Sequence, residues 1–270
     1  MLSVCATPIG NLEDVTLRVL RELAEADFVL CEDTRHTRRL LGRHGIQARL
    51  LSYHEHNEAA RTAELLPRLH AGERIALVSD AGLPGISDPG ARLVAAALDS
   101  GVAVTVLPGA SAIDTALVAS GFTAERYQYL GFLPRRDREL TELWKELSDW
   151  PWPAVAFESP RRLPKTLRSL ATADPEREVA VCRELTKRHE QIVRGRASEV
   201  AARFAEAPKG EITLVIGPGP ERGRVSETAP AAGAQAVVEL VAAGVSRRQA
   251  AEVVSRLTGL PRKRLYDTSL

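Results

Sequence analysis

Short apolar runs alternate with segments of helical periodicity through the first 110 residues of the chain. The runs are apolar almost throughout, which is typical of parallel strands covered on both faces. We expect strands at 2–6, 28–31, 74–78 and 102–106, and helices at 12–24, 37–43, 58–69 and 91–98. This alternation predicts an α/β domain with a largely parallel sheet.

A second set of predicted elements follows residue 121. We expect strands at 127–133, 154–157, 178–182, 190–193 and 211–216, and helices at 137–147, 163–170 and 198–205. The late strands are closely spaced, which favours antiparallel or mixed pairing. The sequence therefore predicts an N-terminal α/β domain over 1–120 and a second α/β domain over 121–220.

The composition changes after the Gly/Pro-rich stretch at 217–220. Helical spacing at 235–243, 246–257 and 261–266 predicts a small helical segment over 228–270 that resembles a helix-turn-helix. Its last 27 residues hold six Arg or Lys against two Asp or Glu.

Length and composition bound the class of protein. At about 150 residues per domain, 270 residues suit two lobes with an appendage. No apolar run approaches the roughly 18 residues of a membrane span, and the N-terminus lacks the pattern of a signal peptide. The three scattered cysteines form no disulfide framework, so we expect a cytoplasmic protein that does not contact a membrane.

Charge is unevenly distributed along the chain. Residues 1–120 hold 11 Arg and no Lys against 15 Asp and Glu, whereas residues 121–270 hold 25 basic against 20 acidic side chains. This asymmetry fits a polyanionic partner bound mainly by the second half, or a solvated surface of uneven charge.

Several catalytic motifs are missing from the sequence. It holds no GxxxxGK[ST] phosphate loop, no GxGxxG after a strand and no GxSxG elbow, which disfavours nucleotide triphosphatases, dinucleotide dehydrogenases and serine hydrolases. His54 and His56 are two residues apart rather than four, and no further ligand set accompanies them, so we expect no metal.

Three loops after predicted strands have the composition of ligand-binding loops. Residues 79–90 contain three Gly, two Pro and two Asp, and 7–11 and 108–112 are rich in small residues. Glycine lets a ligand approach the backbone, and ligands of open α/β sheets bind beyond the carboxyl ends of the strands. The alternative for 79–90 is a capped turn, with Asp88 before Pro89 at the start of a helix.

Charged residues also cluster where strands end. Glu32 and Asp33 precede Arg35, and this group could position or deprotonate a substrate, or could simply begin a helix with Asp33 as its N-cap. The segments 158–162 and 183–190 fit either a site or surface ion pairing.

Together these segments resemble one family. Matching motifs occur at 6–14, 32–35, 79–90, 107–112, 131–135, 157–163, 183–187 and 209–217. The chain is similar over nearly its whole length to the tetrapyrrole methylase family, in its branch of bacterial 16S rRNA (cytidine-2′-O)-methyltransferases, and its helical tail resembles the C-terminal segment of that branch.

The resemblance implies S-adenosylmethionine (SAM) in a cleft between two α/β domains, a homodimer, and a cytidine in the decoding region of the 30S ribosomal subunit as acceptor. It implies cofactor contacts from Pro8, Asp80, Ala81, Gly82, Leu83, Ile86, Ser111, Ala112, Leu133, Glu158 and Thr213. Residues 81–84, Ala-Gly-Leu-Pro, stand where the wider family has Gly-Gly-Asp-Pro. The missing aspartate disfavours a corrin or uroporphyrinogen substrate.

A ribose 2′-hydroxyl needs a base to draw away its proton. We expect Asp33 or Glu32 to serve, with Lys187 as the alternative if burial and neighbouring arginines depress its pKa. Basic side chains that could bind RNA phosphates are Arg35, Arg135, Arg136, Arg161, Arg188, Arg194, Arg247, Arg248 and Lys263. Because aromatic residues are scarce, we expect recognition of RNA shape rather than a stacking platform.

Two other functions remain open at this point. The chain could be a SAM-dependent tetrapyrrole or diphthine methyltransferase. It could instead be a DNA-binding regulator that uses the helical tail and senses a small ligand, in which case no methyl transfer would occur.

Overall fold

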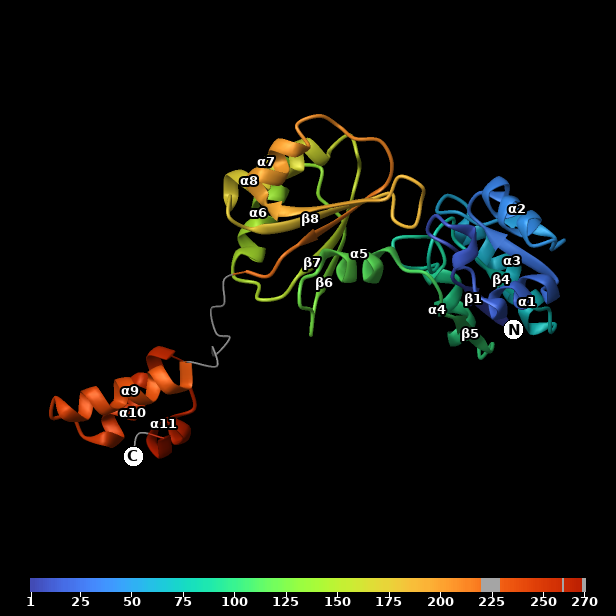
Figure 1. The fold of residues 1–270 in the computed structure, drawn as a ribbon. Helices are drawn as coiled ribbons and strands as arrows, with labels where there is room; N and C mark the ends of the chain where they lie inside the picture. Colours follow the sequence, from blue (N-terminus) through green and yellow to red (C-terminus); the bar gives the residue numbers. More distant parts are fainter. Residues whose placement is uncertain (220–228, 259, 269–270) are drawn as a thin grey trace. The chain divides into compact units, whose positions relative to one another are not determined.

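The computed structural model describes residues 1–219, 229–258 and 260–268, and the chain divides into two compact units, Met1–Pro218 and Gly219–Leu270 (Figure 1). The first unit contains two five-stranded sheets. The strands of the first sheet are β1 (Leu2–Cys5), β2 (Phe28–Cys31), β3 (Leu50–Ser52), β4 (Ile75–Leu77) and β5 (Val104–Leu107). They run in the order β3-β2-β4-β1-β5 with every pair parallel, which confirms the predicted parallel sheet.

Helices cover both faces of this sheet. The helical elements are η1 (Leu12–Asp14), α1 (Leu17–Glu25), α2 (Thr34–Arg43), α3 (Glu58–His70) and α4 (Ala91–Asp99). Phe28 and Leu30 of β2 join the core beneath α3 and α4, whereas the alternating Val29 and Cys31 join the core beneath α1 and α2. Burial on both faces explains why these strands are apolar throughout.

The second sheet is mixed. Its strands are β6 (Gln128–Phe132), β7 (Ala154–Glu158), β8 (Glu178–Arg183), β9 (Gln191–Arg196) and β10 (Ile212–Ile216), in the order β6-β7-β10-β8-β9. Only β6 and β7 pair in parallel, and the other pairs are antiparallel, as the short spacing of the late strands predicts. The helices α6 (Asp137–Ser148), α7 (Leu163–Ala173) and α8 (Ala197–Arg203) share one core with this sheet.

The helix α5 (Ala112–Ser120) lies against the other face of the second sheet. Its Ala116 and Leu117 join a core with Val155, Ala180 and Val215. By packing, α5 therefore belongs with the second sheet although it follows a strand of the first. The predicted domain boundary at 120/121 stays a prediction.

One local expectation is corrected by the structure, and one strand was not expected. The predicted helix at 12–24 is divided into η1 and α1, because the Thr16 side chain accepts a hydrogen bond from the Val19 amide and starts a new helix. The short strand β3 had no sequence signal, since it is three residues long and only half-buried.

The second unit is a small helical bundle, described by itself. It comprises α9 (Ala229–Ala242), α10 (Arg247–Thr258) and α11 (Arg262–Thr268), and its core includes Val237, Ala251, Val254, Leu260 and Leu265. This confirms the predicted helical segment, although Pro220 and Gly259 lie outside the described residues. Within the described ranges, no helix is both long and apolar enough to cross a membrane.

Candidate active site

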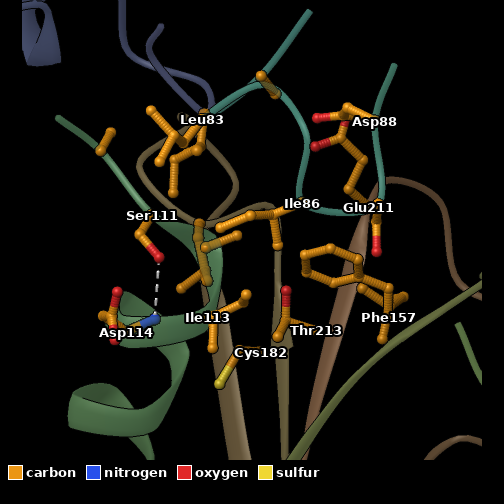
Figure 2. Close-up of a pocket in the computed structure, with 18 of the residues that line it drawn as sticks. Leu83, Ile86, Asp88, Ser111, Ile113, Asp114, Phe157, Cys182, Glu211 and Thr213 are labelled. Atoms are coloured by element: carbon orange, nitrogen blue, oxygen red, sulfur yellow. Dashed lines mark hydrogen bonds between the residues drawn. The ribbon is translucent and has the colours of Figure 1, made fainter. Parts of the chain in front are cut away.

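A cavity of about 740 Å³ lies where loops of the first sheet meet strands of the second sheet (Figure 2). Its volume falls in the range of roughly 300–1,000 Å³ that is usual for small-molecule sites. The first sheet contributes Ile9 and the loops at 81–88 and 108–111, and the first turn of α5 follows them. The second sheet contributes residues of β6, β7, β8 and β10. The three loops that the sequence singles out therefore meet at one cavity.

The loop at 79–90 is held by backbone bonds to the end of β1. The amides and carbonyls of Thr7 and Gly82 bond reciprocally at 2.8 and 3.0 Å. Gly82, Gly85, Ser87 and Gly90 have positive φ angles. A Cβ at Gly90 would lie 2.8 Å from Leu77 Cδ2, so glycine is required at that position.

The alternative interpretation of this loop is wrong in one respect. Gly90, not Asp88, occupies the N-cap position of α4, and no side chain caps the helix there. Asp88 is instead free to line the cavity.

The loop at 108–112 leads into α5, whose N-cap is Ser111. The Ser111 hydroxyl accepts from the Asp114 amide at 3.3 Å (Figure 2). A Cβ at Gly109 would lie 2.8 Å from Ala6 Cβ, so this glycine allows the two loops to approach closely. The start of α5 therefore faces the cavity with small side chains and helix amides.

Most of the predicted cofactor contacts line the cavity. They are Ala81, Gly82, Leu83, Ile86, Ser111, Ala112, Glu158 and Thr213. Pro8, Asp80 and Leu133 are absent from its lining. Asp80 accepts from the Asp33 amide at 3.2 Å and so joins two loops of the first sheet.

Leu133 is 2% exposed and lies in the core of the second sheet. Its neighbour Phe132, which the sequence did not single out, lines the cavity and is 65% exposed. The resemblance to the family implied a cofactor contact from Leu133, but Leu133 is absent from the lining of the cavity.

Glu158 reaches the cavity wall, but its carboxylate is completely buried. The carboxylate accepts from Thr166 Oγ1 at 2.5 Å and from the Ser159 amide at 2.6 Å, and lies 3.2 Å from Arg162 Nη2. These contacts hold the turn between β7 and α7. Glu158 therefore shapes the wall through the turn that it stabilises.

Asp33 and Glu32 follow β2 outside the lining of the cavity. Asp33 is the N-cap of α2, and its carboxylate accepts from the Arg35 side chain and also from the Arg35 amide, which lowers the pKa of Asp33 to about 2. Burial and the charge of Asp80 raise the pKa of Glu32. The capping role of Asp33 is confirmed, and a catalytic role for either carboxylate stays a prediction.

Lys187 does not meet the condition set for it as a base. Its ammonium lies 3.0 Å from Glu184 and 2.9 Å from Glu211. Burial alone would lower the pKa of Lys187, but the hydrogen bonds and charges of these two carboxylates outweigh it and raise the pKa. Lys187 is therefore protonated at neutral pH and cannot accept a proton.

Asp88 is the ionisable group that the sequence interpretation missed. Burial, with the charges of Glu32 and Asp80, raises its pKa to about 6, although a hydrogen bond with Ser79 lowers it. The sequence does contain a signal for a functional role of Asp88, since this residue lies in the longest loop that follows a predicted strand.

The predicted RNA-binding side chains differ in whether they are bound to other groups of the protein. Arg135, Arg161 and Arg188 are exposed. Ion pairs engage two others, Arg35 with Asp33 and Arg136 with Glu139.

Arg194 is held by Glu178 at 3.0 Å and lies over the ring of Phe122 at 4.3 Å. In the helical unit Arg248 and Lys263 are exposed, whereas Arg247 donates to the Tyr266 carbonyl at 2.5 Å. RNA contacts by these residues stay predictions.

Two family models match the chain. Tetrapyrrole (Corrin/Porphyrin) Methylases match residues 1–201, and the RsmI C-terminal HTH domain matches residues 227–270.

Relatives with the name ribosomal RNA small subunit methyltransferase I are similar in sequence. A protein of Synechocystis is 43% identical over 276 residues, 100% of this chain and 97% of that protein. A protein of Thermotoga maritima is 44% identical over 216 residues, 80% of this chain and 97% of that protein.

Solved structures share the fold. Diphthine synthase covers 80% of this chain and 89% of its own, with a TM-score of 0.64 and 15% identity. Uroporphyrin-III C-methyl transferase from Thermus thermophilus, complexed with S-adenosyl homocysteine, covers 80% of this chain and 96% of its own, with a TM-score of 0.56 and 20% identity.

Proposed function

Because the chain belongs to the family of ribosomal RNA small subunit methyltransferase I, within the tetrapyrrole methylases, we propose that it transfers a methyl group from SAM to RNA of the small ribosomal subunit. The acceptor in this proposal is the ribose 2′-hydroxyl of a cytidine in the decoding region of 16S rRNA. The substrate is the assembled 30S subunit.

The observation that carries the proposal is the cavity. Eight of the eleven residues expected to contact SAM line one cavity, although they come from segments far apart in the sequence. The regulator alternative needs a small-ligand cavity as well, but it does not explain the match of residues 1–201 to a methylase family.

The lining suits a nucleoside with a sulfonium group. The apolar side chains of Leu83, Ile86 and Ile113 offer contact to an adenine ring, and the start of α5 offers amides and the Ser111 hydroxyl to polar atoms. The carboxylate of Asp114, at the start of α5, favours a cation in the cavity. When bound, SAM supplies an activated methyl group, and the protein chiefly aligns the acceptor oxygen with it.

Exposed arginines support an RNA substrate. Arg135 and Arg161 each follow a strand whose residues line the cavity. These two side chains are therefore suited to bind the phosphates on either side of an acceptor nucleotide. Filter binding of 30S subunits across a salt series tests this, because each phosphate contact steepens the loss of affinity with salt. If the affinity for 30S subunits did not change with salt, the proposal that the protein binds RNA would be wrong.

Labelled SAM tests the reaction itself. The protein is incubated with tritiated SAM and either 30S subunits, naked 16S rRNA or precorrins. We expect label in 30S subunits, at a cytidine ribose. Label in precorrins alone would favour a tetrapyrrole substrate, and no label in any acceptor would favour the regulator.

The proposal also includes a homodimer and a cytoplasmic location, both taken from the resemblance of the sequence. Sedimentation equilibrium and cell fractionation test these two statements separately from the reaction.

A further inference from the structure

Three aromatic rings form a row at one side of the cavity. The ring centroids of Phe132 and Phe157 are 5.5 Å apart, and those of Phe157 and Tyr129 are also 5.5 Å apart, both pairs in edge-to-face geometry. Phe132 and Phe157 line the cavity. Since Phe132 is 65% exposed, its ring is open to a ligand on one side while Phe157 supports the other.

A hydrogen bond joins these aromatic rings to the loop at 79–90. The Tyr129 hydroxyl lies 2.6 Å from the Ser87 hydroxyl, which joins β6 to this loop. Ser87 has φ 62°, a conformation that costs free energy for a residue with a side chain and often marks a functional site. The next residue is Asp88, which lines the cavity. Burial raises the pKa of Tyr129, the hydrogen bond with Ser87 lowers it, and the charge of Asp88 raises it. Asp88 therefore follows the residue that bonds to Tyr129, and it lines the same cavity as Phe132 and Phe157.

The other carboxylates of the cavity are already engaged. Glu158 is buried with Thr166 and Arg162, and Glu211 pairs with Lys187. Asp114 accepts from the Tyr127 hydroxyl at 3.1 Å, and Figure 2 shows it at the end of the view opposite Asp88.

Asp88 has a different environment. Acidic groups, Glu32 and Asp80, act on it, together with the hydroxyl of Ser79 and the neighbouring Tyr129. In residues 1–219, 229–258 and 260–268, no basic side chain forms an ion pair with Asp88.

We propose, resting on the function proposed above, that this side of the cavity is the acceptor-nucleoside subsite, in which the ring of Phe132 stacks on the nucleobase and Asp88 accepts the proton of the ribose 2′-hydroxyl. Sequence-specific RNA enzymes commonly splay a base out and stack it on an aromatic side chain. One exposed ring is sufficient for one base, so the scarcity of aromatic residues in the chain does not oppose this subsite.

The transfer is balanced in atoms and charge. The 2′-oxygen forms a bond to the methyl carbon as the carbon–sulfur bond breaks, and the electron pair of that bond stays on sulfur. The hydroxyl proton passes to the Asp88 carboxylate and then to water. Burial and the acidic neighbours Glu32 and Asp80 make the carboxylate a stronger base than an ordinary aspartate, and its pKa of about 6 leaves it ionised at neutral pH.

The first experiment substitutes Asp88→Asn and measures methylation of 30S subunits at saturating SAM. We expect kcat to fall by about 10²- to 10⁴-fold, the usual contribution of a general base. S-adenosylhomocysteine affinity, measured by calorimetry, should stay within about threefold of the unsubstituted protein. Asp99→Asn, at the exposed end of α4 and outside the cavity lining, is the matched control and should keep its kcat.

The pH profile separates a base from a structural carboxylate. In the unsubstituted protein, kcat should fall on the acid side with a midpoint near pH 6, because protonated Asp88 cannot accept a proton. Asp88→Asn should lose this limb, and Asp88→Glu, which keeps a carboxylate, should restore part of kcat with a displaced midpoint.

The second experiment compares Phe132→Leu with Phe132→Tyr. Leucine keeps an apolar side chain but has no ring, so we expect KM for 30S subunits to rise about 5- to 100-fold, the range for loss of one stacked base. Tyrosine keeps the ring and should keep KM within about threefold. Affinity for S-adenosylhomocysteine should be unchanged in both variants.

Three results would overturn the proposal: Asp88→Asn with more than about one-third of the original kcat, Phe132→Leu with unchanged KM, or loss of S-adenosylhomocysteine binding in either variant. The last would place the residue in the cofactor site. A failure of the proposed function is distinguished from these, because the unsubstituted protein would then label no 30S subunits at all.

Discussion

The hydroxyl of Thr166 donates to the buried carboxylate of Glu158, with 2.5 Å between Oγ1 and Oε2. This bond links the end of β7 to α7, and the adjacent residues Phe157 and Ser159 line the cavity. The shape of the cavity wall therefore depends on a carboxylate that does not itself face the cavity.

We predict that Glu158→Gln lowers the free energy of unfolding by about 1–3 kcal/mol, because the amide cannot accept from all three donors. Urea denaturation measures this, with Glu139→Gln on the exposed face of α6 as control. If stability were unchanged but S-adenosylhomocysteine affinity fell more than about tenfold, the carboxylate would bind the cofactor directly, as the sequence first suggested.

Gly10 allows the loop after β1 to approach the loop between β8 and β9. A Cβ there would lie 2.6 Å from Lys187 Cγ and 2.9 Å from the Leu185 carbonyl oxygen. We predict that Gly10→Ala forces these loops apart, breaks the 2.9 Å bond from the Asn11 amide to Thr186, and costs about 1–3 kcal/mol in urea denaturation.

Gly42→Ala is the matched control for this substitution. Gly42 lies in α2 with nothing within 4 Å of the new Cβ, so alanine should leave stability unchanged or raise it by up to about 1 kcal/mol. Equal stability of the two variants would show that the loops can separate without cost.

The fold was predictable where the signal is local. Each strand of the first sheet alternates between two apolar cores, and this makes the runs of β1, β2 and β4 visible in sequence. The strand β3 was not visible, because three half-buried residues carry no period. The packing of α5 on the second sheet was not visible either, because it depends on contacts far apart in the chain.

The cavity was predictable from its loops but not from β6. An alternating strand would place Leu130 and Phe132 on the same face and Tyr129 on the other. The register of β6 against β7 shifts between Tyr129 and Phe132, and Gly131 has φ 66°, so both rings lie against Phe157. A bulge of this kind has no signature in a single sequence beyond its glycine, so Phe132 was not expected at the site. Leu133 was expected there only from the resemblance to the family.

The raised pKa of Asp88 predicts a pH-dependent stability. The folded protein binds this proton more tightly than the unfolded chain does, since burial and acidic neighbours raise the pKa from 3.8 to about 6. Ionisation of Asp88 therefore lowers stability progressively as pH rises from about 4 to 6.

Asp88→Asn removes this cost, so we predict that it is more stable than the unsubstituted protein at pH 8 by on the order of 1–3 kcal/mol, and equally stable near pH 4. Urea denaturation at both pH values measures the difference, with Asp99→Asn expected to change stability by less than about 0.5 kcal/mol at either. A variant less stable at pH 8 would mean that the Asp88 carboxylate makes a favourable contact in the folded state.

The helical unit is predicted to serve RNA binding rather than the cofactor. The family model for the helical unit, residues 227–270, is separate from the methylase model, which matches residues 1–201. Every described residue that lines the cavity belongs to Met1–Pro218. A chain ending at Pro218 should therefore fold and bind S-adenosylhomocysteine within about threefold of the full chain.

The chain that ends at Pro218 should bind 30S subunits more weakly than the full chain. The slope of log affinity against log salt should also become shallower, because residues 244–270 carry six basic side chains against two acidic ones. In the full chain, the double substitution of the exposed residues, Arg248→Gln with Lys263→Gln, should change the slope in the same direction by a smaller amount. An unchanged slope in the shortened chain would mean that the helical unit does not contact phosphates, and loss of S-adenosylhomocysteine binding would mean that the cofactor site needs it.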